Sequence, residues 1–145
     1  MKYPIQVTFD CHDPAAQAAF WAEAMHYVVE PPPTGYASWE AWFRARGIPD
    51  DHWNDVSAAL DPDGAGPRLF FQRVPESKVA KNRMHLDLNV SGGPRVAIEE
   101  RKRRILAEVA RLKALGASDH RGSIDQDGEF WVRMNDPEGN EFCVQ

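Results

Sequence analysis

The residues best suited to chemistry lie in the stretch RMHLDLNV, residues 83–90. In an extended strand every second side chain points to the same face, so His85, Asp87 and Asn89 share one face. A carboxylate beside a histidine orients the imidazole and raises its proton affinity, which suits the histidine to act as a general base. Imidazole and carboxylate groups are also metal ligands. The spacing therefore predicts a base, a metal ligand or a hydrogen-bonded pocket histidine at His85.

A second strand of the same character opens the chain. Residues 3–11 alternate an apolar set with a polar set, Ile5, Val7 and Phe9 with Gln6, Thr8 and Asp10. Such alternation is typical of a strand that is buried on one side. We expect the apolar set to pack against a core and the polar set to face the opposite way.

Caps and breakers predict the helices that position these strands. Asp13 is placed to cap a helix over residues 14–25 that begins with proline. Ser38 is placed to cap a short helix that the aromatic-rich stretch after it predicts. Apolar residues at helical spacing predict the longest helix over residues 94–115, closed by Gly116.

Two hairpin turns of similar sequence, DPDG at 61–64 and DPEG at 136–139, separate strand-like runs. Before the second hairpin we expect a short strand near 117–120 and then a polar loop to Gly128. Strand, helix and hairpin thus occur twice in the same order. This order predicts a duplicated βαβββ unit.

Composition narrows the class of protein. The chain has 145 residues with 43% hydrophobic and 27% charged residues, values of an ordinary globular domain. Its net charge of −5 argues against nucleic-acid binding, and no apolar run approaches the length of a membrane span. Cys11 and Cys143 lie far apart in the sequence, without the spacing of a zinc motif. We expect a single cytoplasmic domain with neither nucleic acid nor membrane as partner.

Three motifs resemble one family: FDCHDP at 9–14, LFFQRVPESK followed by KNRMHLDL at 69–88, and DPEGNEFC at 136–143. They resemble the glyoxalase, bleomycin-resistance and ring-cleaving dioxygenase superfamily, also called vicinal oxygen chelate proteins, and within it the glyoxalase-like branch. The resemblance implies an α+β fold in which two βαβββ modules form an incomplete eight-stranded barrel with helices outside. Module one would cover about 1–78, with a helical insert at about 34–53, and module two about 79–145.

The resemblance also implies a polar pocket inside the sheets and a set of metal-ligand positions. The implied pocket residues are Gln6, Thr8, Asp10, Gln72, His85, Asp87 and Cys143, with Trp39 and Trp42 from the insert. The family's ligand positions correspond to Gln6, Gln72, His85 and Cys143. Because this set has no carboxylate, it suits a hard cation poorly, and no cofactor is favoured. Zinc, nickel or iron remains as the fallback.

Two functions follow from these expectations. The first is a small-molecule-binding protein whose aromatic insert forms a lid over the pocket. The second is a lyase or isomerase in which His85, oriented by Asp87, acts as base or metal ligand. The insert aromatics would either line the pocket or attach the insert to the rim of the barrel. Relatives often pair, which allows a homodimer.

Overall fold

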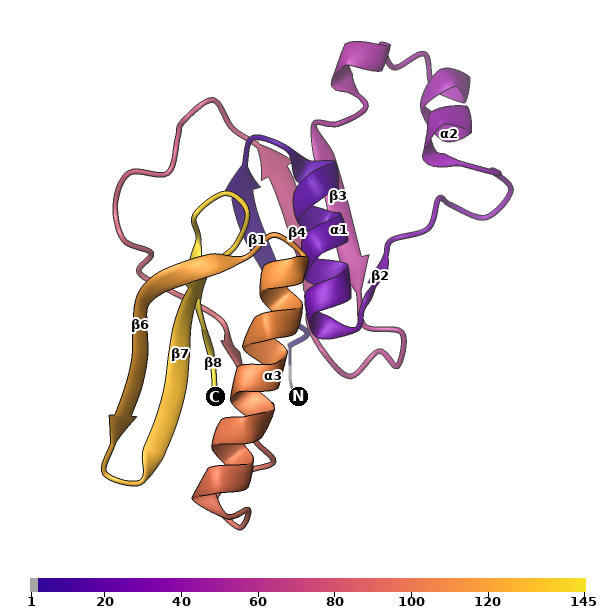
Figure 1. The fold of residues 1–145 in the computed structure, drawn as a ribbon. Coiled ribbons are helices and arrows are strands. Elements are labelled where there is room, and N and C mark those ends of the chain that lie inside the picture. Colours follow the sequence, from indigo (N-terminus) through magenta and orange to yellow (C-terminus); the bar gives the residue numbers. More distant parts are fainter. Residues whose placement is uncertain (1–2) are drawn as a thin grey trace. The chain divides into compact units, whose positions relative to one another are not determined.

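The duplicated order of strands and helices predicted from the sequence is present in the computed structural model, which describes residues 3–145 (Figure 1). Chain contacts divide the structure into one unit that ends at Ser77 and a second unit over Lys78–Gln145. Each unit holds one four-stranded mixed sheet. Among the described residues no strand pairing joins the two sheets, so they do not close into a barrel. None of the described helices is long and apolar enough to cross a membrane.

The first unit has strand order β1-β4-β3-β2, with β1 and β4 parallel and the other pairs antiparallel. Its elements are β1 (Gln6–Cys11), α1 (Pro14–Met25), β2 (Val28–Val29), α2 (Trp39–Ala45), the 3₁₀ turn η1 (Asp50–His52), β3 (Val56–Leu60) and β4 (Arg68–Arg73). The insert between β2 and β3 therefore contains the predicted short helix, α2. The short strand β2 was not predicted from the sequence.

Helix α1 forms because its start is well capped and its large apolar side chains, Phe20 and Trp21, are buried. The Asp13 side chain accepts a hydrogen bond from the backbone N–H of Ala16 at 3.1 Å, as predicted. Trp21 is almost completely buried and its ring lies 5.4 Å from that of Phe9 on β1. Phe9 in turn stacks on Phe71 of β4 at 5.1 Å. These contacts place the apolar face of β1 against α1, which leaves its polar face on the opposite side.

The second unit has strand order β5-β8-β7-β6. Its elements are β5 (Asp87–Leu88), α3 (Ile98–Ala114), β6 (Ser118–Gln126), β7 (Glu129–Asn135) and β8 (Glu141–Val144). One side of α3 buries Ile105, Val109 and Leu112, and the helix contacts β7 and β8. The matching buried residues of those two strands are Phe130, Val132, Met134, Phe142 and Val144.

Two sequence expectations about the strands were wrong. The polar loop expected before Gly128 is the second half of β6, which pairs with β7 around an irregularity between Asp119 and Ser123. Backbone hydrogen bonds to β7 hold this part of β6, and Ile124 is its one apolar residue, so the sequence shows no apolar alternation there. Ile5, expected to pack in the core, lies before β1 and is 72% exposed.

Candidate functional site

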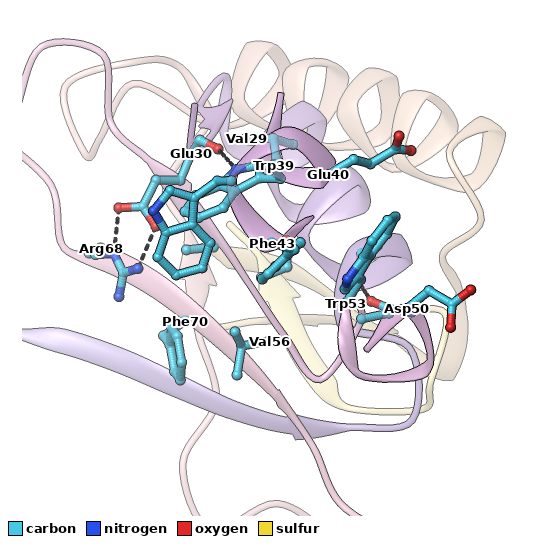
Figure 2. A pocket seen from close by; sticks show the side chains of 15 residues that line it. Val29, Glu30, Trp39, Glu40, Phe43, Asp50, Trp53, Val56, Arg68 and Phe70 are labelled. Carbon is cyan, nitrogen blue, oxygen red and sulfur yellow. Dashed lines mark hydrogen bonds and ion pairs between the residues drawn. The ribbon is translucent and has the colours of Figure 1, made fainter. Parts of the chain in front are cut away.

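A cavity of about 540 Å³ lies in the first unit (Figure 2). Its lining comes from the insert, from the end of β2, and from strands β3 and β4. The large or charged lining residues are Glu30, Trp39, Glu40, Trp42, Phe43, Asp50, Trp53, Val56, Arg68 and Phe70. The volume falls within the usual range for small-molecule sites in proteins.

Aromatic rings of the insert form most of the apolar wall. The Phe43 ring stacks on Trp53 with centroids 5.9 Å apart, and the Trp42 ring meets Phe43 edge to face at 5.3 Å. Trp39 packs edge to face on Trp42 at 5.5 Å. Such ring pairs add stability beyond the area they bury. The insert is therefore an ordered aromatic cluster, although no residue of α2 is fully buried.

Local hydrogen bonds fix the position of this cluster. The Ser38 hydroxyl caps α2 by accepting from the Ala41 backbone N–H at 3.1 Å, as predicted. The Trp39 indole N–H donates to the backbone carbonyl of Glu30 at 2.8 Å. The Trp53 indole N–H donates to the carbonyl of Ile48 at 2.9 Å. Both indole N–H groups are thus bonded to main chain, while the Trp53 ring stacks on Phe43 and has the Arg44 guanidinium 4.9 Å from its centre.

A polar group closes one end of the cavity. The Arg68 guanidinium on β4 donates to both carboxylate oxygens of Glu30, at 3.1 and 2.5 Å. It also donates to Gln6 Oε1 at 2.7 Å and lies 5.0 Å from the centre of the Phe70 ring. The side chains of Arg68 and Glu30 are 32% and 27% exposed, so a partly desolvated ion pair borders an aromatic space.

The predicted polar face of β1 is present, and it continues onto β4. The parallel register places Gln6, Thr8 and Asp10 beside Arg68, Phe70 and Gln72. Gln72 donates its amide N–H to Asp10 Oδ1 at 2.8 Å. Gln6 is bonded to Arg68 as described above. The two glutamines expected at metal-ligand positions therefore each hold a neighbouring charged side chain.

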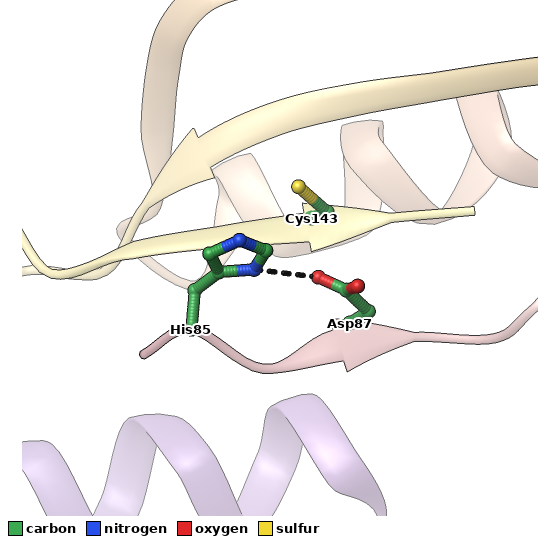
Figure 3. A group of neighbouring side chains, drawn as sticks. All are labelled: His85, Asp87 and Cys143. Carbon is green, nitrogen blue, oxygen red and sulfur yellow. Dashed lines mark hydrogen bonds and ion pairs between the residues drawn. The ribbon is translucent and has the colours of Figure 1, made fainter. Parts of the chain in front are cut away.

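The second unit contains a separate cluster of His85, Asp87 and Cys143 (Figure 3). His85 Nδ1 lies 2.7 Å from Asp87 Oδ1, so the predicted pairing of imidazole and carboxylate is present. Cys143 on β8 is directly opposite Asp87 on β5. One potential ligand atom from each residue lies within 4.8 Å of the others. About 39% of the His85 side chain and 38% of the Asp87 side chain are exposed, so small solutes can reach the pair.

The surroundings of Cys143 keep its thiol protonated. Burial raises the pKa of this thiol, and the charge of Asp87 and a hydrogen bond with it raise the pKa further, from 9.0 to about 11. The positive charges of Arg133 and Lys81 oppose this effect only in part. A thiol with such a pKa is a poor nucleophile at neutral pH.

The predicted pocket residues thus fall into two groups. Trp39 and Trp42 line the cavity of the first unit, and Gln6 contacts that cavity's Arg68. Thr8, Asp10 and Gln72 extend the same sheet face. His85, Asp87 and Cys143 come together in the second unit. A pocket shared by the two groups stays a prediction.

Sequence reasoning missed the charged end of the cavity, Arg68 and Glu30. The alternation in RLFFQR, residues 68–73, places Arg68 and Gln72 on one face of β4 and was the available signal. Glu30 follows the two-residue strand β2, and no sequence pattern predicts that it pairs with Arg68 across the sheet.

Comparison with known proteins gives a family match over almost the whole chain. The sequence model of the family described as glyoxalase-like domain matches residues 6–145. No curated protein matches the sequence.

Solved structures with the same fold are similar over nearly their full lengths. A glyoxalase/bleomycin resistance protein/dioxygenase family enzyme from Burkholderia phytofirmans PsJN has a TM-score of 0.60 at 13% identity, covering 96% of this chain and 94% of that one. The fosfomycin resistance protein FosX from Listeria monocytogenes has a TM-score of 0.62 at 12% identity, covering 100% and 91%. A FosX mutant in complex with Mn(II) and dihydroxypropylphosphonic acid has a TM-score of 0.57 at 16% identity, covering 100% and 90%.

Proposed function

The chain belongs to the glyoxalase-like domain family, and we propose that it is a small-molecule-binding protein whose aromatic insert forms the lid of its binding cavity. The observation that carries the proposal is the cavity of about 540 Å³ in the first unit, with aromatic walls and one ion-paired end. Apolar walls with a few polar groups at fixed positions are the usual composition of small-molecule sites. The ligand would be an apolar or aromatic compound.

The fold supports the proposal in two further ways. Strands β3 and β4 supply one wall of the cavity, and the insert supplies the other from a single stretch of chain. Polar side chains on β1 and β4 lead away from the charged end along the same sheet face. A ligand larger than the cavity would meet these groups next. The FosX mutant of the same fold also forms a complex with a small molecule, dihydroxypropylphosphonic acid.

The experiment is a screen of planar aromatic compounds by ligand-observed NMR, followed by calorimetric titration of the hits. Trp42→Ala should weaken binding about tenfold or more, because a large aromatic contact is lost. Tyr36→Ala is the matched control, since Tyr36 lies in the same segment, is 37% exposed and does not line the cavity. Equal affinities in a folded Trp42→Ala variant and the wild type would refute a site at this cavity.

A second candidate function rests on the cluster in the second unit. With Nδ1 of His85 directed at Asp87, Nε2 is the atom available to accept a proton from a carbon next to a carbonyl. This geometry supports a lyase or isomerase that acts on an enolisable substrate. His85→Ala should then abolish turnover without changing the fold. An unchanged rate would exclude His85 as the base.

The same three side chains are the candidate ligands if the protein is an enzyme that uses a metal ion. Mn(II) in the FosX complex is a hard cation that prefers oxygen ligands. Imidazole, carboxylate and thiolate together fit zinc better, and His85, Asp87 and Cys143 would hold it. Bound there, zinc would act as a Lewis acid toward a substrate oxygen. Elemental analysis of protein purified without added metal or chelator distinguishes the functions. If the protein is a metal-dependent enzyme, the analysis should find about one zinc ion per chain, and the His85→Ala variant should lack it.

A further inference from the structure

We propose that the cavity of the first unit selects uncharged planar compounds that carry a hydrogen-bond acceptor, and that the pair Glu30–Arg68 imposes this selection. The inference rests on the proposed binding function and names the class of ligand. Three observations support it: the walls, the donor count of Arg68 and the distribution of charge.

The walls offer ring faces and few polar atoms, which, apart from the charged residues, come from Asn54, Ser57 and the indole groups. The indole N–H groups of Trp39 and Trp53 are already bonded to backbone carbonyls. Phe43 and Phe70 add rings without polar atoms. In Figure 2 the rings of Trp39, Phe43 and Phe70 and the side chain of Val56 surround the same space. A flat ring system gains most from such walls, because it can stack on their faces.

Arg68 is the polar group that can meet a ligand at the end of this space. A guanidinium has five N–H donors. The structure commits three of them: Nε–H and one hydrogen of the second terminal nitrogen to Glu30, and one hydrogen of the first terminal nitrogen to Gln6. Two donors are left for an acceptor such as a ketone or phenol oxygen. The guanidinium carbon lies 5.0 Å from the centre of the Phe70 ring, which lines the same cavity.

The charge at this end is already balanced. Both carboxylate oxygens of Glu30 are engaged by Arg68, so an anionic ligand finds no uncompensated positive charge. The other charged lining residues are the acidic Glu40 and Asp50. Their carboxylates point away from Phe43 in Figure 2, so a cationic ligand finds no free carboxylate inside. An uncharged ligand with a hydrogen-bond acceptor is therefore the ligand that can bind Arg68 while its ion pair with Glu30 stays intact.

Four ring-matched probes test the inference by calorimetric titration of the wild-type protein: acetylnaphthalene, naphthalene, naphthoate and naphthylmethylammonium. We expect acetylnaphthalene to bind about tenfold more tightly than each of the others, since it alone combines no charge with an acceptor for Arg68. This comparison requires no mutation. Equal or tighter binding of naphthoate or naphthylmethylammonium would overturn the inference.

Glu30→Gln provides a gain of function that a merely structural role of Glu30 would not produce. The variant leaves the Arg68 charge uncompensated, so affinity for naphthoate should rise about tenfold while that for acetylnaphthalene changes little. Glu76→Gln is the matched control, because it removes an exposed acidic charge of the same unit that does not line the cavity, and it should alter naphthoate binding less than about twofold. Unchanged naphthoate binding in a folded Glu30→Gln variant would contradict the assigned role.

Failure of the inference can be told apart from failure of the proposed function. If all four probes bind with similar affinity and Trp42→Ala weakens every one, the cavity is a binding site but the ion pair does not select. If none binds and the aromatic screen gives no hit that depends on Trp42, the proposed function itself is wrong, and the inference falls with it.

Discussion

Cys143 in the metal-free protein should react slowly with a neutral disulfide such as dithiodipyridine. Its thiol has a pKa of about 11 instead of 9.0, so at about pH 8 the reactive thiolate is roughly 100-fold rarer than in an ordinary cysteine. A thiolate of higher pKa is a stronger nucleophile, which recovers part of this loss. The net expectation is a reaction about tenfold slower than that of a small free thiol at the same pH.

The informative perturbation is Asp87→Asn. It removes the carboxylate charge that raises the pKa of Cys143 and keeps the burial that is the largest cause. The pKa should therefore fall but stay above 9.0, and the variant should react faster than the wild type and more slowly than the free thiol. Release of the thione chromophore gives the rate between about pH 7 and pH 10, where thiolate formation controls it.

Two controls assign the signal. Cys143→Ser should abolish the measured phase, because the remaining cysteine, Cys11, is 2% exposed. The reasoning is refuted if Cys143 in the wild type reacts as fast as the free thiol, or if Asp87→Asn leaves the rate unchanged. A fast reaction would also mean that the second unit presents a nucleophile, which the present geometry does not support.

Three stability predictions, all measured by urea unfolding, follow from local contacts. Asp13→Ala should cost about 1 kcal/mol through loss of the α1 cap. Glu141→Gln should cost about 1–2 kcal/mol, since the carboxylate accepts from the Asn82 backbone N–H and pairs with Lys78. Burial opposes ionisation of Glu141, but these bonds lower its pKa from 4.5 to about 2, so the difference between wild type and variant should persist above about pH 4.5 and vanish as the pH falls toward 2. Gly116→Ala should cost about 1 kcal/mol because φ is +112° there. A pH-independent Glu141→Gln effect, or no effect of the other two, would contradict these assignments.

Features of the fold that depend on neighbouring residues could be predicted from the sequence. The caps at Asp13 and Ser38 are present because each side chain bonds a backbone N–H three residues along. The DPEG turn contains Asp136, whose carboxylate accepts from the Glu138 and Asn140 backbone N–H groups. The dipeptide Asp127-Gly128 also carried a readable signal. Both residues have positive φ and join β6 directly to β7, as in a two-residue hairpin.

Contacts across the sheet could be predicted only in part. The polar alternation of β1 was predicted correctly. The hydrogen bonds of Gln6 with Arg68 and of Gln72 with Asp10 were not, because they depend on the register between β1 and β4. Arg68 meets Glu30 because β4 and the end of β2 lie two strands apart in the same sheet, a relation absent from sequence spacing. The pairing of His85 with Asp87 was foreseeable because the two residues are two positions apart in the sequence, although only Asp87 lies in β5 and His85 comes before it.

The way the insert is attached to the first unit bears on how this protein can diversify. The rings of Trp39, Trp42, Phe43 and Trp53 support one another within one stretch of chain that leaves the sheet after β2 and returns at β3. The rings of Trp21, Phe9 and Phe71, which pack α1 on the sheet, come from the helix and from β1 and β4 and not from the insert. Substitutions in the insert can therefore reshape the wall of the cavity without disturbing the folding core. We therefore expect that the segment can be exchanged as a unit, and that the proposed ligand preference would change with it while the sheet and α1 keep their fold.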